Sequence, residues 1–389
     1  MATTTTIPAP VVRTRDLSID YLRTTLTLMV IGHHSSLAYT TFAHFNKQHM
    51  FQSTAPVVDS TRWLFLDYAE NFNDVFFMSL MFFVSGLFVY PALRRHGTLG
   101  FIRDRFLRLG VPFAFAVVFL MPIAYYASWQ LTGRSTGFVN FYRILAAGGF
   151  AVGPEWFIWV LLFFGVTLAV ILIPVQRWVP AAARLMTKLR DRPFATFAAI
   201  FFLASLAYLP LLARYGFGAW TDLLTSPFSF QISRIGLYAM WFVFGFLVGA
   251  PGIDQGLLSR DGALARHRRL WIWSCVLAYN ALVFVPKIYP QPKLEAVLWV
   301  ISCVASCFGF LALFRGVHLT SRPWMNSLSR SAYVMYLVHY VFITWTQRLM
   351  LDQPIHAGIK FLFVFLATTF LSWLTAQIFL RIPKLNTIL

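Results

Sequence analysis

Long apolar stretches, separated by short polar connections, follow one another along the whole sequence. About twenty consecutive apolar residues in a helix match the hydrocarbon thickness of a bilayer. Ten windows of this kind occur, at residues 17–41, 72–92, 110–129, 155–176, 194–213, 232–250, 269–287, 294–314, 330–349 and 358–380. The pattern predicts an all-α polytopic membrane protein with about ten transmembrane helices.

The basic residues are distributed unevenly between the two sides that these spans define. Twenty-one Lys and Arg residues lie on the side of the two termini, ten lie on the opposite side, and Arg23 lies within the first span. Loops rich in Lys and Arg stay in the cytoplasm during insertion. The bias predicts that both termini are cytoplasmic, and we expect the protein in a bacterial inner (plasma) membrane.

Composition agrees with this class and excludes others. Charged residues make up 12% of the 389 residues, against about 25% in soluble domains. The net charge of +18 comes from basic residues scattered through short loops, which indicates membrane orientation and no nucleic-acid partner. The three cysteines, Cys275, Cys303 and Cys307, fall in apolar helices and predict no disulfide framework.

The chain reads as a single integral membrane domain over residues 1–389. Residues 1–16 lack the apolar core of a signal peptide, and we expect a flexible cytoplasmic tail there. Residues 94–109 alternate apolar side chains and arginines at helical spacing. This spacing predicts an amphipathic segment in the cytoplasmic interface of the membrane.

The first predicted span contains charged and polar residues that are costly inside a membrane. Asp20 and Arg23 are three residues apart and can pair on one face of a helix. His34 follows Arg23 by eleven residues, about three helical turns, so the two side chains lie on one face roughly 16 Å apart. We expect this face of the helix to be a functional site.

His34 has the chemistry of a general base. A neutral imidazole can accept a proton near physiological pH, which suits the activation of a hydroxyl nucleophile. The adjacent His33 points about 100° away on a helix and either packs against a neighbour or takes the same role. A buried histidine held by a hydrogen bond between helices is the alternative interpretation.

A basic cluster precedes the third span. Arg94 and Arg95 are followed by Arg105 and Arg108, which are three residues apart. Guanidinium groups match phosphate oxygens in geometry and charge. The cluster predicts a cytoplasmic phosphate site, for which coenzyme A is a candidate ligand. Membrane orientation and lipid headgroup binding are the alternative.

Further polar residues lie in later spans. Glu155 opens the fourth span, where it contacts a substrate or stabilises the first helical turn. Ser331, Tyr333 and His339 lie on the ninth span. The sequence has no phosphate-binding loop, dinucleotide fingerprint, zinc-type cluster or GxSxG nucleophile elbow. We therefore expect no metal, no bound cofactor and no covalent serine mechanism.

Several motifs resemble those of the acyltransferase 3 family and occur along the chain in the same order. The members of this family are integral membrane enzymes of the glucan succinyltransferase and sugar O-acyltransferase type. These motifs are the spacing of Arg23 and His34, the apolar run ending at Gly86, Arg105-x-x-Arg108-Leu109 with Pro112, Gly153 to Phe157, and Ser331-Ala332-Tyr333 with Tyr336 and His339. The resemblance covers nearly the whole chain.

This resemblance implies transfer of an acetyl, succinyl or similar group from acyl-CoA, as co-substrate, to a hydroxyl. The acceptor is a carbohydrate, a lipid-linked sugar or another extracytoplasmic molecule. His34 then acts as the base and Arg23 stabilises the donor or the oxyanion. Donor binding falls to Arg94, Arg95, Arg105 and Arg108, with supporting roles for Asp20, His33, Glu155, Ser331, Tyr333 and His339. Direct transfer and an acyl-histidine intermediate both stay open.

The alternative is a multispan transporter or exporter whose pathway is lined by His34 and Arg23. Ion-coupled transporters tend to show internal repeats and carboxylates near the bilayer midplane. Here no repeat is visible, and the acidic residues cluster near the predicted span ends, at Asp20, Asp67, Glu70, Asp74 and Glu155. The sequence leaves open the acyl group, the acceptor and the oligomeric state.

Overall fold

The computed structural model describes residues 16–134, 136–221 and 226–383. The expected tail at residues 1–16 lies outside this part, apart from Asp16. The described residues form helices and no strand beyond an isolated bridge between Trp220 and Gln231. The helices are α1 (Leu17–Leu37), α2 (Leu64–Gly86), α3 (Val89–Arg105), α4 (Val111–Phe115), α5 (Met121–Leu131), α6 (Phe138–Gly148), α7 (Trp156–Val175), α8 (Val179–Thr187), α9 (Pro193–Tyr215), α10 (Ile235–Gly249), α11 (Ala263–Arg266), α12 (Arg268–Ile288), α13 (Pro292–Gly316), α14 (Pro323–Met350) and α15 (Ala357–Phe379).

A helix overlaps each of the ten predicted windows, and the all-helical membrane class is confirmed. Six helical stretches of the described residues are long and apolar enough to cross a membrane. They are Val89–Leu131, Phe138–Asp191, Pro193–Tyr215, Arg268–Ile288, Pro292–Gly316 and Ala357–Phe379. The helices α1, α2 and α14 contain more polar residues, and α10 is short, so the count of ten and the side of the termini stay predictions.

The start of α2 corrects a predicted boundary. The helix begins at Leu64 and not at residue 72, so Glu70 and Asp74 lie inside it and not near its end. The search for apolar windows missed the first turns of α2, because it scores every charged side chain as if it faced lipid. In the structure Glu70 faces His33 of α1, and Asp74 pairs with Arg234 at the start of α10.

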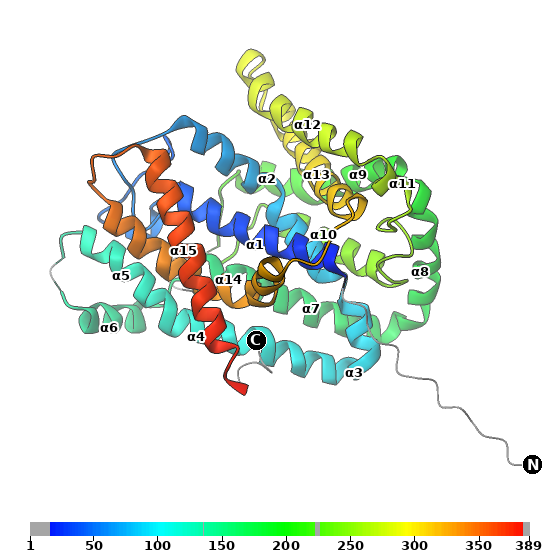
Figure 1. Ribbon diagram of the computed structural model, residues 1–389, viewed down its shortest axis with the longest axis horizontal. Helices are drawn as coiled ribbons and strands as arrows, with labels where there is room; N and C mark the ends of the chain where they lie inside the picture. Colours follow the sequence, from blue (N-terminus) through cyan, green and yellow to red (C-terminus); the bar gives the residue numbers. More distant parts are fainter. Residues whose placement is uncertain (1–15, 135, 222–225, 384–389) are drawn as a thin grey trace, which may run out of the picture.

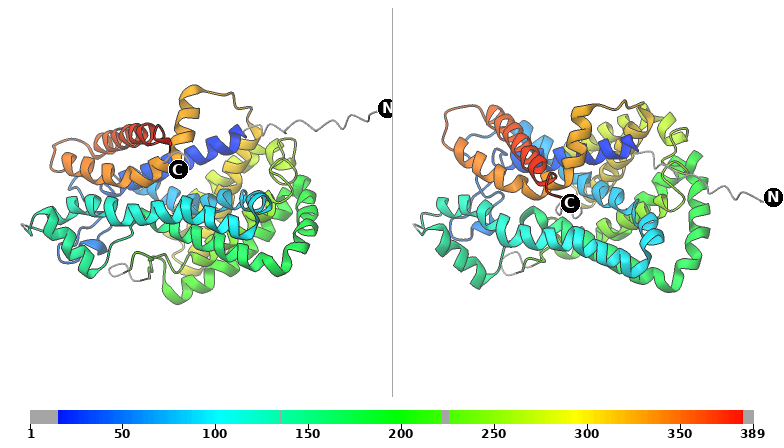
Figure 2. Two further views of the ribbon diagram at one scale, coloured as in Figure 1. Left: turned by 90° about the horizontal axis from the view of Figure 1, so that it is seen from below. Right: turned by 60° about the horizontal axis from the view of Figure 1, so that its bottom comes forward.

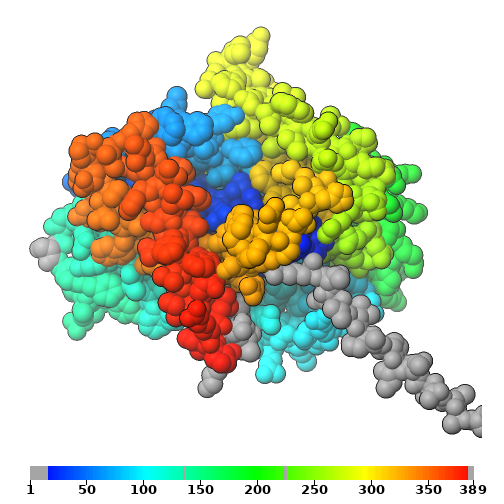
Figure 3. Space-filling model, viewed as in Figure 1, coloured from blue at the N-terminus to red at the C-terminus, as the bar shows by residue number. Residues whose placement is uncertain are grey.

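The helix α1 carries several polar residues and is enclosed by other helices. It packs against α2, α13, α14 and α15, and Figure 1 shows it running through the middle of the molecule. On the face drawn in Figure 3, α1 reaches the surface only as a small dark-blue area between its neighbours. The imidazole side chains of His33 and His34 are directed at neighbouring helices, whereas the Arg23 side chain remains exposed.

The predicted amphipathic segment at residues 94–109 is helical on both sides of a kink at Gly97, whose φ is 65°, and it continues into the third span. Beyond this kink the helical course runs through two π-helical segments, Phe106–Gly110 and Ala116–Leu120, and forms one long rod that ends with α5 (Figure 2). Each π-helical segment lies beside a proline, Pro112 or Pro122, which has no N–H for the α-helical ladder. The rod thus connects the arginines of α3 directly to the middle of the fold.

Glycines allow α2 and α10 to approach closely, as the small residues Ser85-Gly86 suggest. A Cβ atom added at Gly245 would lie 2.0 Å from the carbonyl oxygen of Phe83, and one at Gly86 would lie 2.2 Å from that of Phe242. Such distances exclude any larger residue without a shift of the backbone. Small residues at helix contacts are a usual device of membrane helix packing.

Arg315 anchors the start of α1. Its buried guanidinium donates to Asp16 Oδ2 at 2.6 Å and to Ser18 Oγ at 2.7 Å, and it also pairs with Asp254. The Nε atom donates to the Leu258 carbonyl at 2.6 Å. Burial alone would raise the pKa of Asp16, but the bonds from Ser18 and Arg315 hold it below its usual value.

We expect Arg315→Met to lower the free energy of unfolding by about 1–3 kcal/mol, because it leaves the mostly buried Asp16 carboxylate and the Leu258 carbonyl without their donor. Thermal unfolding of the detergent-purified protein measures the effect, with the exposed Arg322→Met as control. A carboxylate whose pKa is depressed in the folded state stabilises at neutral pH, and this stability is lost as the pH falls. The difference from wild type should therefore narrow below about pH 4. A constant difference over this range would contradict the role of Asp16.

Candidate active site

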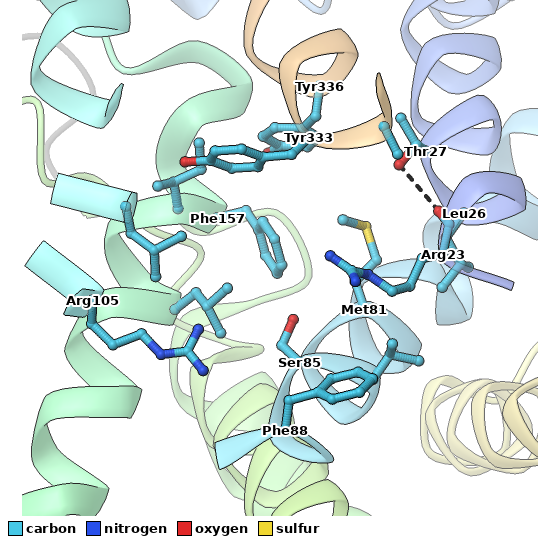
Figure 4. Close-up of a pocket in the computed structure, with 15 residues that line it drawn as sticks. Arg23, Leu26, Thr27, Met81, Ser85, Phe88, Arg105, Phe157, Tyr333 and Tyr336 are labelled. Carbon is cyan, nitrogen blue, oxygen red and sulfur yellow. Dashed lines mark hydrogen bonds between the residues drawn. The ribbon is translucent and has the colours of Figure 1, made fainter. Parts of the chain in front are cut away.

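A pocket of about 230 Å³ lies between α1, α2, α7 and α14, and we call it the central pocket. Figure 4 shows the guanidinium groups of Arg23 and Arg105 extending into it from opposite walls, with Ser85 between them. Tyr333 and Tyr336 of α14 close it on another side. Its remaining lining residues are Leu26, Thr27, Met81, Val84, Phe88, Leu109, Phe157, Ile158, Leu161 and Ala332.

A second pocket adjoins the first. It has a volume of about 260 Å³ and contains Arg95, Arg105 and Arg108, so we call it the arginine pocket. Phe88 and Arg105 line both pockets. The two adjoining pockets therefore bring the guanidinium groups of Arg95, Arg105 and Arg108 close to that of Arg23.

Aromatic rings hold two of these arginines in place. The Arg105 guanidinium carbon lies 4.9 Å from the centre of the Phe101 ring, and that of Arg23 lies 5.9 Å from the centre of the Phe88 ring. Arg94 is exposed and lines neither pocket. Of the predicted basic cluster, Arg95, Arg105 and Arg108 thus line a pocket and Arg94 does not.

Tyr333 connects α14 to the arginine cluster. Pro112 has no N–H to donate to the carbonyl of Arg108, four residues earlier. The hydroxyl of Tyr333 donates to this carbonyl at 2.6 Å. By contrast, Ser331 is buried, and its hydroxyl is already engaged. Its Oγ donates to the Ser327 carbonyl and accepts from the Gln377 side chain. Ser331 does not line the central pocket.

His34 lies beyond the central pocket, on the same face of α1 as Thr27 but two turns further along the helix. Its ring is 5.5 Å from that of His339 and 5.3 Å from that of Tyr340, measured between ring centres. The Gln347 side chain donates to the His34 carbonyl at 3.0 Å. The helix α14 therefore positions both the ring and the backbone of His34.

His339 has a defined tautomer in its neutral form. Its Nδ1 atom lies within hydrogen-bond distance of the Tyr336 carbonyl, which can only accept, so Nδ1 carries the proton. The Nε2 atom then has a free lone pair. This atom is buried and has no hydrogen-bond partner among the described residues. His339 thus offers an acceptor beside the His34 ring.

His33 points to α2 and away from α14. Its Nδ1 lies 3.6 Å from a carboxyl oxygen of Glu70, and its ring centre lies 5.2 Å from that of Phe77. The two neighbouring imidazoles are nearly perpendicular, with centres 5.0 Å apart. His33 and His34 therefore meet different helices, as the 100° step of a helix requires.

Glu155 is completely buried just before α7. Neither of its carboxyl oxygens has a hydrogen-bond partner within the described ranges. The adjacent carbonyl of Pro154 accepts from the hydroxyl of Tyr336, a lining residue of the central pocket. A buried carboxyl without partners is costly, which makes it a candidate for contact with a substrate.

The structure brings Arg23, Arg105 and Tyr333 together around one pocket, and it places His33 and His34 of α1 and His339 of α14 in a separate cluster. Asp20 lies one turn before Arg23 on α1, next to the pocket end of the helix. No group of three or more His, Cys, Asp and Glu residues suited to a metal occurs among the described residues.

The sequence analysis did not assign Thr27, Glu70 or Gln347 to the candidate site. Thr27 could have been found, because it lies on the face that joins Arg23 and His34. The contacts of Glu70 with His33 and of Gln347 with His34 connect different helices, so no local spacing predicts them.

Comparison with protein families identifies the class of this protein. The chain belongs to the acyltransferase 3 family, because the model of this family, described as an acyltransferase domain, matches residues 16–377. Searches of curated proteins and of solved structures gave no significant match. Together with the apolar helices, the family makes this chain an integral membrane acyltransferase.

Proposed function

We propose that the protein transfers an acetyl, succinyl or similar acyl group from acyl-CoA to a hydroxyl of a carbohydrate or another extracytoplasmic acceptor. The observation that carries this proposal is the pair of adjoining pockets, one lined by Arg95 and Arg108, the other by Arg23, with Arg105 lining both. Three guanidinium groups suit the phosphates of coenzyme A. The central pocket, whose lining is largely apolar, suits its pantetheine arm and thioester.

In this mechanism Arg23 stabilises the negative charge that develops on the thioester oxygen when the acceptor attacks. His34 takes the proton of the acceptor hydroxyl and returns it to the departing thiolate of coenzyme A. The new ester bond replaces the thioester bond, so no further reactant is needed. Because His34 lies two turns beyond Thr27, the thioester must extend past Thr27 to meet it.

The expected membrane orientation indicates which compartment the arginine pocket and His34 each face. If the basic loops are cytoplasmic, the arginine pocket faces the compartment that contains acyl-CoA. His34 then lies toward the opposite side, where an extracytoplasmic acceptor arrives. This arrangement suits a bacterial inner membrane, since the donor and the acceptor meet within the protein without either crossing the bilayer.

We expect Arg105→Ala to weaken acyl-CoA binding by about 10- to 100-fold, because a hydrogen bond to a charged group contributes about 1.5–3 kcal/mol. Titration of acetyl-CoA and succinyl-CoA into the purified protein in nanodiscs measures the change. Arg103→Ala is the matched control, because Arg103 is exposed on the same helix and lines neither pocket. Repeating the titration with acetyl-3′-dephospho-CoA identifies the phosphate that Arg105 contacts.

An unchanged dissociation constant for Arg105→Ala would leave this arginine only a role in orientation or lipid contact. Absence of binding and of turnover by the wild-type protein would instead favour a transporter whose pathway is lined by Arg23 and His34. An acyltransferase binds and consumes acyl-CoA, whereas a transporter does neither, so acyl-CoA binding and turnover distinguish the two functions.

A further inference from the structure

The last turn of α1, which follows His34, needs hydrogen-bond donors from outside the helix. The final carbonyl groups of a helix have no donor within it. Here the N–H of Tyr39 donates to the Ser36 carbonyl at 2.8 Å and not to that of Ser35, four residues earlier. An unsatisfied carbonyl is costly in a membrane protein. Other segments of the chain therefore have to cover this end of α1.

Gln347 of α14 provides one such donor. The residue is 1% exposed, and its Nε2 atom donates to the carbonyl of His34 at 3.0 Å and to that of Ser35 at 3.4 Å. Gln347 lies two turns beyond His339 and Tyr340 on α14, whose rings adjoin the His34 ring. One helix thus contacts both the imidazole and the main chain of His34.

The segment that precedes α2 returns to the end of α1 and supplies further donors. The N–H of Asp59 and the guanidinium of Arg62 both donate to the Ala38 carbonyl, at 3.0 and 3.1 Å. Arg62 also donates to the carbonyl of Thr40 at 3.1 Å. Asp59 Oδ1 accepts from the N–H and the hydroxyl of Thr61, at 2.8 Å each. These bonds form a compact turn that covers the end of α1.

A buried ion pair joins this turn to α15. Lys360 Nζ lies 2.7 Å from Asp59 Oδ2, and both side chains are almost completely buried. The helix α15 packs beside α14 and against α1 (Figure 1). It reaches α1 two residues before His34, because a Cβ atom added at Gly32 would lie 3.8 Å from the Phe365 ring. The turn is thereby tied to a helix that also contacts α1 beside the histidines.

Such an ion pair has a better use than stability. The desolvation of two buried charges offsets much of their attraction, and the best-attested role of a buried pair is to select one arrangement of packed elements. Apolar contacts tolerate sliding, whereas an ion pair with fixed partners does not. On α1, a shift by one residue would turn His34 by about 100°. A costly pair at this end of the helix therefore suits a need to fix His34.

We propose that four residues hold the end of α1 so that the His34 imidazole is positioned for proton transfer. We call them the α1 clasp, and they are Asp59, Arg62, Gln347 and Lys360. Gln347 and Lys360 are positioning residues, because they act on His34 through the main chain of α1. The effect on catalysis rests on the proposed acyl transfer, whereas the effect on the His34 ring does not.

Kinetics of two clasp variants test the effect on catalysis. Asp59→Asn combined with Lys360→Met removes both charges, so that neither is left buried alone. Gln347→Met removes the amide donor and keeps an unbranched side chain. We expect each variant to lower kcat about tenfold, because a small displacement of a catalytic group is enough for such a loss. The dissociation constant of acyl-CoA should stay unchanged.

Two controls separate positioning from a general effect on the fold. In a protein that already carries His34→Ala, neither clasp variant should lower kcat further, because the group that the clasp positions is absent. Lys293→Met, at an exposed lysine in the first turn of α13, should retain the wild-type kcat. Thermal unfolding confirms that each preparation is folded, and Gln347→Met decides the test if the double variant does not fold.

Solid-state NMR of ¹⁵N-histidine-labelled protein in nanodiscs reports on the imidazole rings without any acyl donor. The His34 signals are identified by their loss in His34→Ala. We expect them to shift in both clasp variants, while the signals of the exposed His318 stay in place.

Unchanged His34 signals in both variants would overturn the proposal. An equal fractional loss of kcat with and without His34 would do the same, since the clasp would then act on the fold and not on the base. Shifted His34 signals in a protein without acyl transfer would support the positioning and contradict only the proposed reaction.

Discussion

Replacing His34 by alanine is expected to reduce acyl transfer by about 10²–10⁴-fold, the usual contribution of a general base. The substitution removes the imidazole that lies between His33 and His339 and leaves the arginines of the two pockets in place. The binding constant for acyl-CoA should therefore change little. Turnover by the purified variant in nanodiscs, measured with titrated donor, separates the two quantities.

Matched variants of the neighbouring imidazoles identify the base. His33→Ala should cost much less than His34→Ala, because His33 is directed at Glu70 and not at α14. His339→Asn should give a partial loss, since it removes the acceptor beside the His34 ring. If His33→Ala abolished turnover and His34→Ala retained it, the assignment would be reversed. An acylated peptide containing His34, trapped in the absence of acceptor, would favour a covalent intermediate over direct transfer.

Arg23→Ala is expected to lower kcat by about 10²–10³-fold, the typical effect of removing one oxyanion-stabilising group. Arg23 lines the central pocket opposite Arg105, and its guanidinium is steadied by the Phe88 ring. Arg23→Lys should restore part of the rate, because it keeps the charge but loses the fork of donors. Steady-state kinetics with varied acyl-CoA measure kcat and KM separately.

The exposed Arg143→Ala, on α6, is the control for loss of a positive charge elsewhere in the protein. A rise in KM at unchanged kcat would assign Arg23 to donor binding and not to the transition state. A loss in both variants would point to a general effect of charge on folding or insertion, which thermal unfolding of the same preparations detects.

Much of the fold follows from the local sequence. The spacing of apolar windows predicts a helix at each of ten positions, and helices overlap all of them, because main-chain hydrogen bonding within a membrane leaves few other choices. The start of α2 is the exception. Its charged first turns lower the mean hydropathy, so no apolar window includes them. They are stable as a helix because Glu70 faces His33 and Asp74 pairs with Arg234.

Only part of the candidate site could be predicted from the sequence. Helical periodicity alone places Arg23 and His34 on one face of α1, and the family match covers both of them. The same reasoning grouped four arginines, although Arg94 lines neither pocket. It also gave Ser331 a place in the site, whereas its hydroxyl is engaged by Ser327 and Gln377.

The sequence by itself determined the membrane class, the helical elements and the chemical types that one helix face presents. These properties depend on hydropathy and on the 3.6-residue period, both of which act over a few residues. Only the tertiary structure decided that Arg23 meets Arg105 across a pocket and that His34 lies beside His339. Such contacts join residues separated by about three hundred positions, such as His34 and His339, and only the packing of helix against helix determines them.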